Sequence, residues 1–276
     1  FSRGAAIALS DRVPGLENLG FRVINERTYR VVPAGAEDGA RIWLHDMLIE
    51  RATGVAIDLD ALERPLEAAM LAIADGAAES DGYNRLVLEA ALPWREAALL
   101  RALGRYLRQL RIRYGQDYLA GTLSRHAGIT RDIVALFRAR FDPALVGDRA
   151  AREAGIRACI ETALAEVTSL DDDRILRRFV NLVEAAVRTN FFQSGADGHP
   201  RETISFKFAC ARVTAMPLPR PLFEIFVYAP RVEGVHLRFG YVARGGLRWS
   251  DRPEDFRTEI LGLMKAQQVK NAVIVP

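Results

Sequence analysis

A glycine pair flanked by arginines, near the end of the chain, has the composition of an anion-binding loop. Arg244-Gly245-Gly246-Leu247-Arg248 follows an apolar run. Two adjacent glycines let the backbone adopt positive φ and approach a ligand closely. A neighbouring arginine can hold a carboxylate through two parallel hydrogen bonds. A glycine pair after a strand is usually a hairpin or bulge, however, so the motif alone is a weak signal of binding.

The next segment predicts a helix whose last turn carries an amide and an ammonium. Ser250 or Asp251 is the expected N-cap, and Pro253 and Glu254 suit the first turn. Five residues at spacings of 4, 3, 4 and 3 share one helix face, namely Phe256, Ile260, Leu263, Gln267 and Lys270. An apolar stripe that ends in Gln267 and Lys270 directs these two polar groups to the same side.

Lys270 is notable because the chain has only three lysines among its 38 basic residues. A compact ammonium in so arginine-rich a chain suggests that a planar guanidinium cannot replace it there. Spacing leaves two interpretations open: Lys270 contacts a ligand, or it satisfies carbonyls at the helix C-terminus. Lys265 lies about 140° around the helix and points elsewhere.

The elements that would position these residues fall into three regions. Residues 1–58 predict a short helix stopped by Gly20, then strands over about 21–32 and 41–49. This pattern suits a small ferredoxin-like or ACT-like α+β module. Residues 196–276 change to short strands near Ile204, Phe223, Val235 and Tyr241, followed by the helix and a last apolar strand. They predict the truncated start of an α/β substrate-binding domain.

Residues 59–195 predict a helical region, with helices continuing to about Asn190. Ser169 is the expected N-cap of the last helix, whose buried stripe comprises Ile175, Phe179, Leu182 and Ala186. Arginines at positions 101, 105, 108, 111 and 113 are interpreted as the solvated face of an earlier helix. The fold class predicted for the chain is therefore α+β and predominantly α-helical.

The composition disfavours several classes of function. The 38 basic residues face 35 acidic ones in alternation, so the sequence shows no basic patch for nucleic acid. Cys159 and Cys210 have neither metal-ligand nor disulfide spacing, and both are expected to be core residues of a cytoplasmic protein. No apolar run is long enough to cross a membrane, and four scattered histidines predict no metal site. The chain starts at Phe1 and stops after an apolar run, which suggests an internal piece of a longer protein.

The region from Arg231 to Pro276 resembles the very long-subunit NAD-specific glutamate dehydrogenases of bacteria. The run Arg-Gly-Gly-Leu-Arg-Trp-Ser-Asp-Arg-Pro-Glu-Asp-Phe-Arg-Thr-Glu carries the similarity, together with Met264-Lys-Ala-Gln-Gln-Val-Lys270. The segments from Leu16 and Tyr83 are similar to the ACT-like and helical regions of that family. The resemblance implies an oxidoreductase that converts L-glutamate to 2-oxoglutarate in amino-acid catabolism, and a full-length protein that forms homo-oligomers.

The same resemblance implies site residues. Arg244 stands where shorter relatives carry a lysine that binds the side-chain carboxylate of the substrate, beside Gly245 and Gly246. Gln267 and Lys270 match positions that reach the α-carboxylate. The family's catalytic lysine, its general-acid aspartate and its NAD-binding Rossmann domain would follow Pro276, so no catalytic, cofactor or metal residue is expected in this chain. The chain alone is expected to be inactive. The alternative interpretation is an amino-acid-sensing or oligomerisation scaffold without catalysis.

Overall fold

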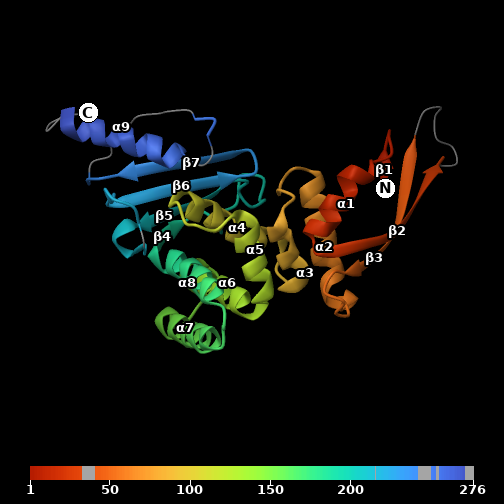
Figure 1. Ribbon diagram of the computed structural model, residues 1–276, viewed down its shortest axis with the longest axis horizontal. Coiled ribbons are helices and arrows are strands. Elements are labelled where there is room, and N and C mark those ends of the chain that lie inside the picture. The colour runs from red at the N-terminus through yellow and green to blue at the C-terminus, as the bar shows by residue number, and fades with distance from the viewer. Residues whose placement is uncertain (33–40, 215, 242–249, 253–254, 271–276) are drawn as a thin grey trace. The chain divides into compact units, whose positions relative to one another are not determined.

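The computed structural model describes residues 1–32, 41–214, 216–241, 250–252 and 255–270, with residues 267–270 described by their backbone alone. The chain forms two compact units, Phe1–Trp94 and Arg95–Pro276. Each contains one antiparallel sheet and several helices (Figure 1). The predicted helix-rich α+β class is therefore confirmed. The proposed boundaries near residues 58 and 195 stay predictions.

The first unit has a three-stranded sheet in the order β1-β3-β2. Its elements are β1 (Ser2–Arg3), α1 (Leu9–Asn18), β2 (Phe21–Val31), β3 (Ile42–Arg51), α2 (Leu59–Ala74), a 3-10 turn (Gly82–Asn84) and α3 (Arg85–Glu89). Gly20 ends α1 as predicted: its φ is +97°, and its N–H donates to the carbonyl of Glu17. The turn delivers the chain directly into β2. Asp58 caps α2 by accepting a hydrogen bond from the N–H of Ala61.

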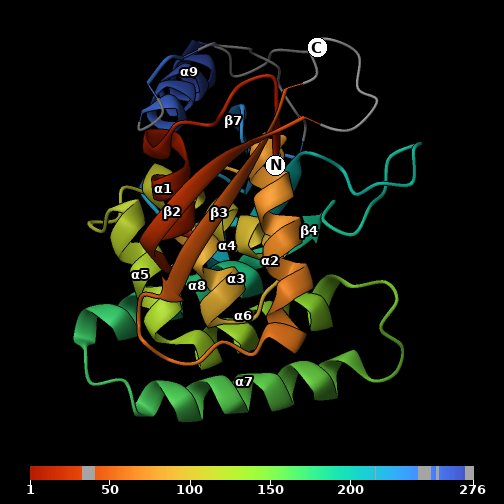
Figure 2. The same ribbon diagram turned by 90° about the vertical axis from the view of Figure 1, so that its right-hand side faces the viewer.

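The second unit combines a helical layer with a four-stranded antiparallel sheet in the order β4-β5-β6-β7. Its helices are α4 (Trp94–Gln109), α5 (Gln116–Arg125), α6 (Ala127–Phe141), α7 (Arg149–Ala165), α8 (Leu170–Ala185) and α9 (Phe256–Lys270). Its strands are β4 (Ala186–Thr189), β5 (Ile204–Ala209), β6 (Phe223–Ala229) and β7 (Val232–Arg238), with a 3-10 turn at Cys210–Arg212. Helix α7 packs against α6 (Figure 2).

Aromatic side chains fix the sheet of the second unit to its helices. Tyr106 of α4 stacks on Phe208 of β5, with ring centroids 4.4 Å apart, and lies 5.3 Å from the ring of Phe226. Phe137 of α6 meets Phe206 edge-on. All of these rings are almost fully buried, so one face of the sheet forms the core with α4 and α6.

Three expectations from the sequence are corrected. The chain is not helical as far as Asn190, because β4 begins at Ala186 and pairs with β5. Val187 and Thr189 are β-branched and favour a strand, and the neighbouring strand supplies hydrogen bonds that periodicity cannot reveal. Cys159 is exposed on α7, whereas Cys210 is buried as expected.

The third correction concerns the arginines of α4. Arg101 is fully buried, and Arg105 and Arg108 form ion pairs with Glu233 of β7. Only the last two arginines, at positions 111 and 113, are exposed as a solvated face would be. A guanidinium with a long apolar stem can be buried when a distant carboxylate meets it, and Glu233 is 125 residues further along the chain than Arg108.

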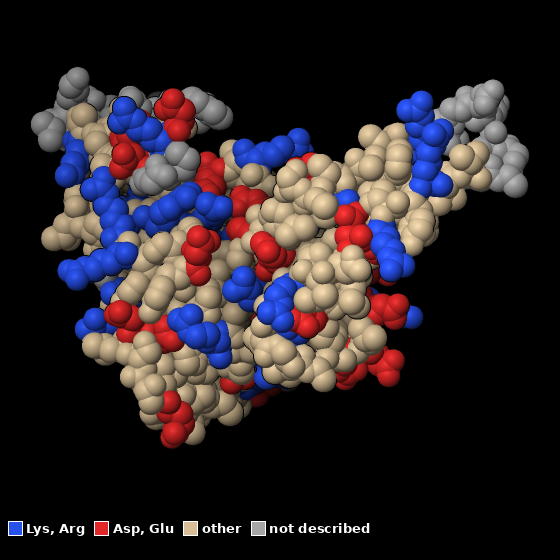
Figure 3. All heavy atoms as spheres, turned by 45° about the vertical axis from the view of Figure 1, so that its right-hand side comes forward, with Lys and Arg blue, Asp and Glu red and all other residues tan. Residues whose placement is uncertain are grey.

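Basic and acidic side chains are intermixed on the surface of the described residues that Figure 3 shows. In the described part of the chain no helix is long and apolar enough to cross a membrane. Among the same residues no group of three or more His, Cys, Asp or Glu side chains could hold a metal ion.

Candidate functional site

The predicted ligand-binding residues lie after β7 and at the end of α9. Arg244, Gly245 and Gly246 fall outside the described residues, as does most of the strand expected at Tyr241–Ala243. Gln267 and Lys270 lie in the last turn of α9, a helix that the sequence predicts to extend to this point. Their side chains are outside the described part, so the five predicted contacts stay predictions. The described residues do show how the two flanking elements, β7 and α9, are held.

Helix α9 begins later than its predicted cap. Its first residue is Phe256, whereas Ser250 and Asp251 lie six and five residues earlier. The Ser250 hydroxyl instead donates to Glu259 Oε1 at 2.8 Å and accepts from the N–H of Arg252 at 3.2 Å. Ser250 therefore ties the segment before α9 to the first turn of the helix and does not occupy the N-cap position. Pro253 and Glu254 are outside the described residues.

The side of α9 that packs most deeply is also displaced from the predicted stripe. Phe256, Ile260 and Leu263 are half-buried, whereas Arg257 and Leu261 are buried. The fully buried side is therefore centred about one residue beyond the predicted stripe. Because position 257 carries an arginine, apolar periodicity alone assigns it to the solvent side.

A buried bidentate ion pair explains why this arginine faces inward. Arg257 Nε lies 2.8 Å from Glu224 Oε1, and Arg257 Nη2 lies 2.9 Å from Oε2. The two residues are 2% and 0% exposed. Both carboxylate oxygens and two guanidinium nitrogens are thus satisfied by the geometry that makes Arg–carboxylate pairs specific. The pair joins α9 to β6, an inner strand of the sheet.

Further contacts tie both elements to the C-terminal end of α4 and to Arg111, just after it. The backbone N–H of Arg257 donates to Gln109 Oε1 at 3.4 Å. Arg111 reaches Asp255, just before α9, at 3.1 Å. Arg108, in the last turn of α4, pairs with Glu233 of β7 at 3.0 Å. The strand that precedes Arg244 in the sequence and the helix that follows it are therefore both fastened to the C-terminal end of α4 or to the residues just after it.

Burial is the largest cause of the pKa shifts of Glu224 and of the two groups near it, Tyr106 and Cys210. Burial raises the pKa of Glu224, and the hydrogen bonds and positive charge of Arg257 oppose that shift. Burial likewise raises the pKa of Tyr106 well above its usual value and the pKa of Cys210 to about 12. Both groups therefore keep their protons at neutral pH. The Arg257–Glu224 ion pair therefore lies beside two neutral groups, an arrangement that suits a fixed structural support.

Glu224 and Arg257 were not among the residues predicted from the sequence. One signal was available: Glu224 interrupts the otherwise apolar run Phe223–Tyr228 of a strand. A carboxylate inside such a run requires a buried cation. The identity of that cation depends on tertiary contacts and could not be deduced.

Three family descriptions match successive parts of the chain. Residues 1–62 match the ACT3 domain of glutamate dehydrogenase, residues 78–143 its helical motif 3, and residues 159–276 the catalytic domain of bacterial NAD-glutamate dehydrogenase. The first match agrees with the ACT-like module predicted from the strand and helix pattern.

Curated relatives match along the whole chain. NAD-specific glutamate dehydrogenase of Halomonas elongata is 51% identical over 100% of this chain, and that of Mycobacterium tuberculosis is 44% identical over 100%. The Pseudomonas aeruginosa protein of the same name is 50% identical over 98%. The chain spans 17% of the length of each of these relatives. With all three family descriptions and these relatives in agreement, the chain belongs to the family of bacterial NAD-specific glutamate dehydrogenases.

Proposed function

We propose that the protein to which this chain belongs oxidises L-glutamate with NAD. The overall reaction is L-glutamate, NAD⁺ and water giving 2-oxoglutarate, ammonium, NADH and a proton. The observation that carries the proposal is the whole-chain identity of 51% with a protein named NAD-specific glutamate dehydrogenase. The chain would contribute one side of the glutamate site, together with part of a helical region.

The proposed substrate contacts follow from the chemistry of a dicarboxylate. Arg244 would bind the side-chain carboxylate, and Gly245 and Gly246 would let the backbone approach it. Lys270 would bind the α-carboxylate, assisted by the amide of Gln267. Two cationic anchors at a fixed separation would hold the substrate in one orientation, which reduces the entropy cost of reaching the transition state.

The support described around α4 favours this assignment. Arg244 follows β7, which Glu233 fastens to α4, and Lys270 ends the helix that Arg257 fastens to β6. Residues that bind one small molecule from two separate segments need those segments held at a constant separation. The Arg108–Glu233 pair at the C-terminal end of α4 and the Arg257–Glu224 pair between α9 and β6 would supply that constraint.

The described residues do not fit an NAD site. Their sheets are antiparallel, whereas the dinucleotide fold requires parallel strands joined by helices. The sequence also lacks a Gly-x-Gly-x-x-Gly motif. We therefore propose that NAD and the groups that transfer protons are held by other parts of the protein, and that this chain alone is inactive. We further propose a cytoplasmic homo-oligomer, as implied by the family.

The experiment that tests the proposed contacts compares two lysines of one helix in the full-length protein. Lys270→Ala should lower kcat/KM for glutamate by roughly 10- to 150-fold, because a hydrogen bond to a charged group contributes about 1.5–3 kcal/mol. Lys265→Ala is the matched control, since Lys265 is an exposed residue of the same helix. Unchanged glutamate kinetics with altered oligomerisation in Lys270→Ala would favour the sensing or scaffold alternative.

A further inference from the structure

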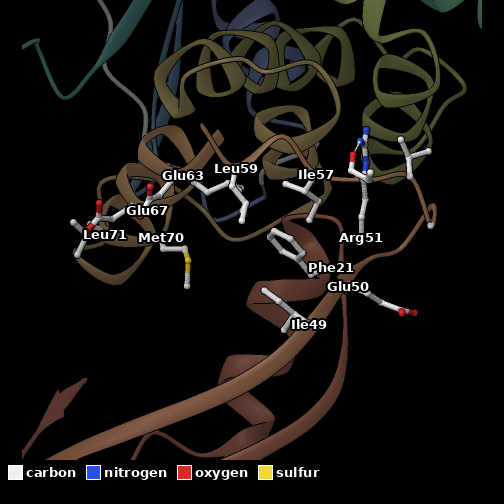
Figure 4. A pocket seen from close by; sticks show the side chains of 14 residues that line it. Phe21, Ile49, Glu50, Arg51, Ile57, Leu59, Glu63, Glu67, Met70 and Leu71 are labelled. Carbon is white, nitrogen blue, oxygen red and sulfur yellow. Dashed lines mark hydrogen bonds between the residues drawn. The ribbon is translucent and has the colours of Figure 1, made fainter. Parts of the chain in front are cut away.

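Helix α2 and the end of β3 border an open apolar groove in the first unit. The groove has a volume of about 770 Å³ and is lined chiefly by apolar side chains, among them Phe21, Ile49, Leu59, Leu66, Met70 and Leu71. Figure 4 shows Phe21 and Ile49 facing Leu59 and Met70 across this space. We call it the α2 groove.

Large apolar side chains of the α2 groove are exposed to solvent. Leu59 is 66% exposed, Leu71 58% and Met70 48%, and Val55 in the adjoining loop is exposed as well. Other residues of α2, such as Leu62 and Ala69, are buried. Helix α2 therefore carries apolar side chains on more of its circumference than it buries against the rest of the first unit. Contiguous exposed apolar side chains of this kind mark interaction sites.

The charges around the α2 groove are predominantly negative. Glu63 and Glu67 lie one turn apart on α2 and line the groove, and neither forms an ion pair among the described residues. Arg51, which also lines the groove, is bound to Glu89, with Nε 3.1 Å from Oε1, and Arg64, between the two glutamates in sequence, does not line the groove. Because the whole chain carries a net charge of +3, this local excess of carboxylates is distinctive.

We propose that the α2 groove docks an amphipathic helix with an apolar stripe bordered by lysine or arginine. Leu59 and Met70 are eleven residues apart, about 16 Å along the axis, which matches partner anchors at i, i+4, i+7 and i+11. Basic side chains beside that stripe meet Glu63 and Glu67. This interaction surface is independent of glutamate binding.

The test is the binding of two designed peptides to the 276-residue chain, measured by fluorescence anisotropy. One peptide of 18 residues carries leucines at the four anchor positions and lysines beside them. The other has the same leucines but glutamate in place of every lysine. We expect the basic peptide to bind at micromolar concentrations, at least tenfold more tightly than the acidic one. Equal binding of the two peptides, or binding of neither, overturns the proposal.

Charge reversal locates the binding site. Glu63→Lys with Glu67→Lys should weaken binding of the basic peptide by tenfold or more and strengthen binding of the acidic peptide. Glu166→Lys with Glu202→Lys is the matched control, because both of those residues are exposed and lie in the second unit. If the control pair weakens binding as much as the groove pair does, the attraction is general and the proposal fails.

Replacing exposed apolar residues with aspartate tests whether the peptide binds in the α2 groove. Leu59→Asp with Met70→Asp should abolish binding, whereas Val146→Asp with Leu170→Asp, at exposed sites of the second unit, should not. Circular dichroism of every variant verifies that its helices are retained. Sedimentation of the chain alone distinguishes another occupant: a dimer that disappears in the Leu59→Asp, Met70→Asp variant would show that a second copy fills the groove, and would overturn the proposal.

Discussion

Removing the guanidinium of Arg257 should release α9 from the sheet. In Arg257→Met the Glu224 carboxylate stays buried, since it is 0% exposed, but it loses both of its guanidinium hydrogen bonds. Breaking a buried ion pair by removing one partner costs about 3–5 kcal/mol. Among the described side chains of α9, Leu261 is the buried apolar one and the other large apolar residues are only half-buried, so the helix has limited apolar packing to compensate for that loss.

Hydrogen exchange of the α9 amides measures this release directly. At about 1.4 kcal/mol per power of ten, the loss corresponds to a roughly 100- to 4,000-fold fall in protection, down to the limit set by full exposure of the helix. Arg111→Met is the matched control, because it breaks an exposed ion pair to the same segment at Asp255. An exposed pair contributes about 0–1 kcal/mol, so the control should change protection less than tenfold.

The pH dependence separates an uncompensated charge from lost packing. Burial already raises the pKa of Glu224, and without Arg257 the pKa should rise further. A carboxyl whose pKa is raised in the folded state loses stability as pH increases from its unfolded value of about 4.3 towards the folded value. The defect in Arg257→Met should therefore be larger at pH 8 than at pH 5, and Arg257→Met with Glu224→Gln should remove that dependence. A defect that is independent of pH, or α9 protection unchanged in the single variant, would refute this reasoning.

Two further predictions concern the second unit. Iodoacetamide at pH 8 should modify exposed Cys159 alone in the native chain and both thiols after denaturation, because burial raises the pKa of Cys210 to about 12; mass spectrometry of the adducts checks this. Burial raises the pKa of Asp172, but hydrogen bonds from Arg125 and His126 outweigh it and leave that pKa lowered. The resulting stability is present above about pH 4 and is lost as pH falls through the folded pKa, so the urea midpoints of wild type and Asp172→Asn should converge in acid.

Local signals predicted most elements of the fold. Ser169 caps α8 as expected, its hydroxyl accepting from the N–H of Asp172, and the stripe from Ile175 to Ala186 is buried. A cap and a helix face depend on residues a few positions apart, so the sequence displays them directly. The local sequence does not predict β4, because this strand is stabilised by pairing with β5, which begins only at Ile204.

The support of the candidate site depends on distant partners and could not be predicted. Arg108 and Glu233 are 125 residues apart, and Arg257 and Glu224 are 33 apart. Nothing in the arginine spacing of α4 or α9 distinguishes a buried guanidinium from a solvated one. The proposed contacts Arg244, Gln267 and Lys270 came from resemblance to a family, whereas the ion pairs around α4 came from the structure alone.

The most direct test of the proposed function is NADH formation by the full-length protein, followed at 340 nm with L-glutamate and NAD. We predict NADH formation that requires L-glutamate and yields 2-oxoglutarate and ammonium in equal amounts. Absence of glutamate-dependent NADH formation from correctly folded full-length protein would contradict the proposed activity.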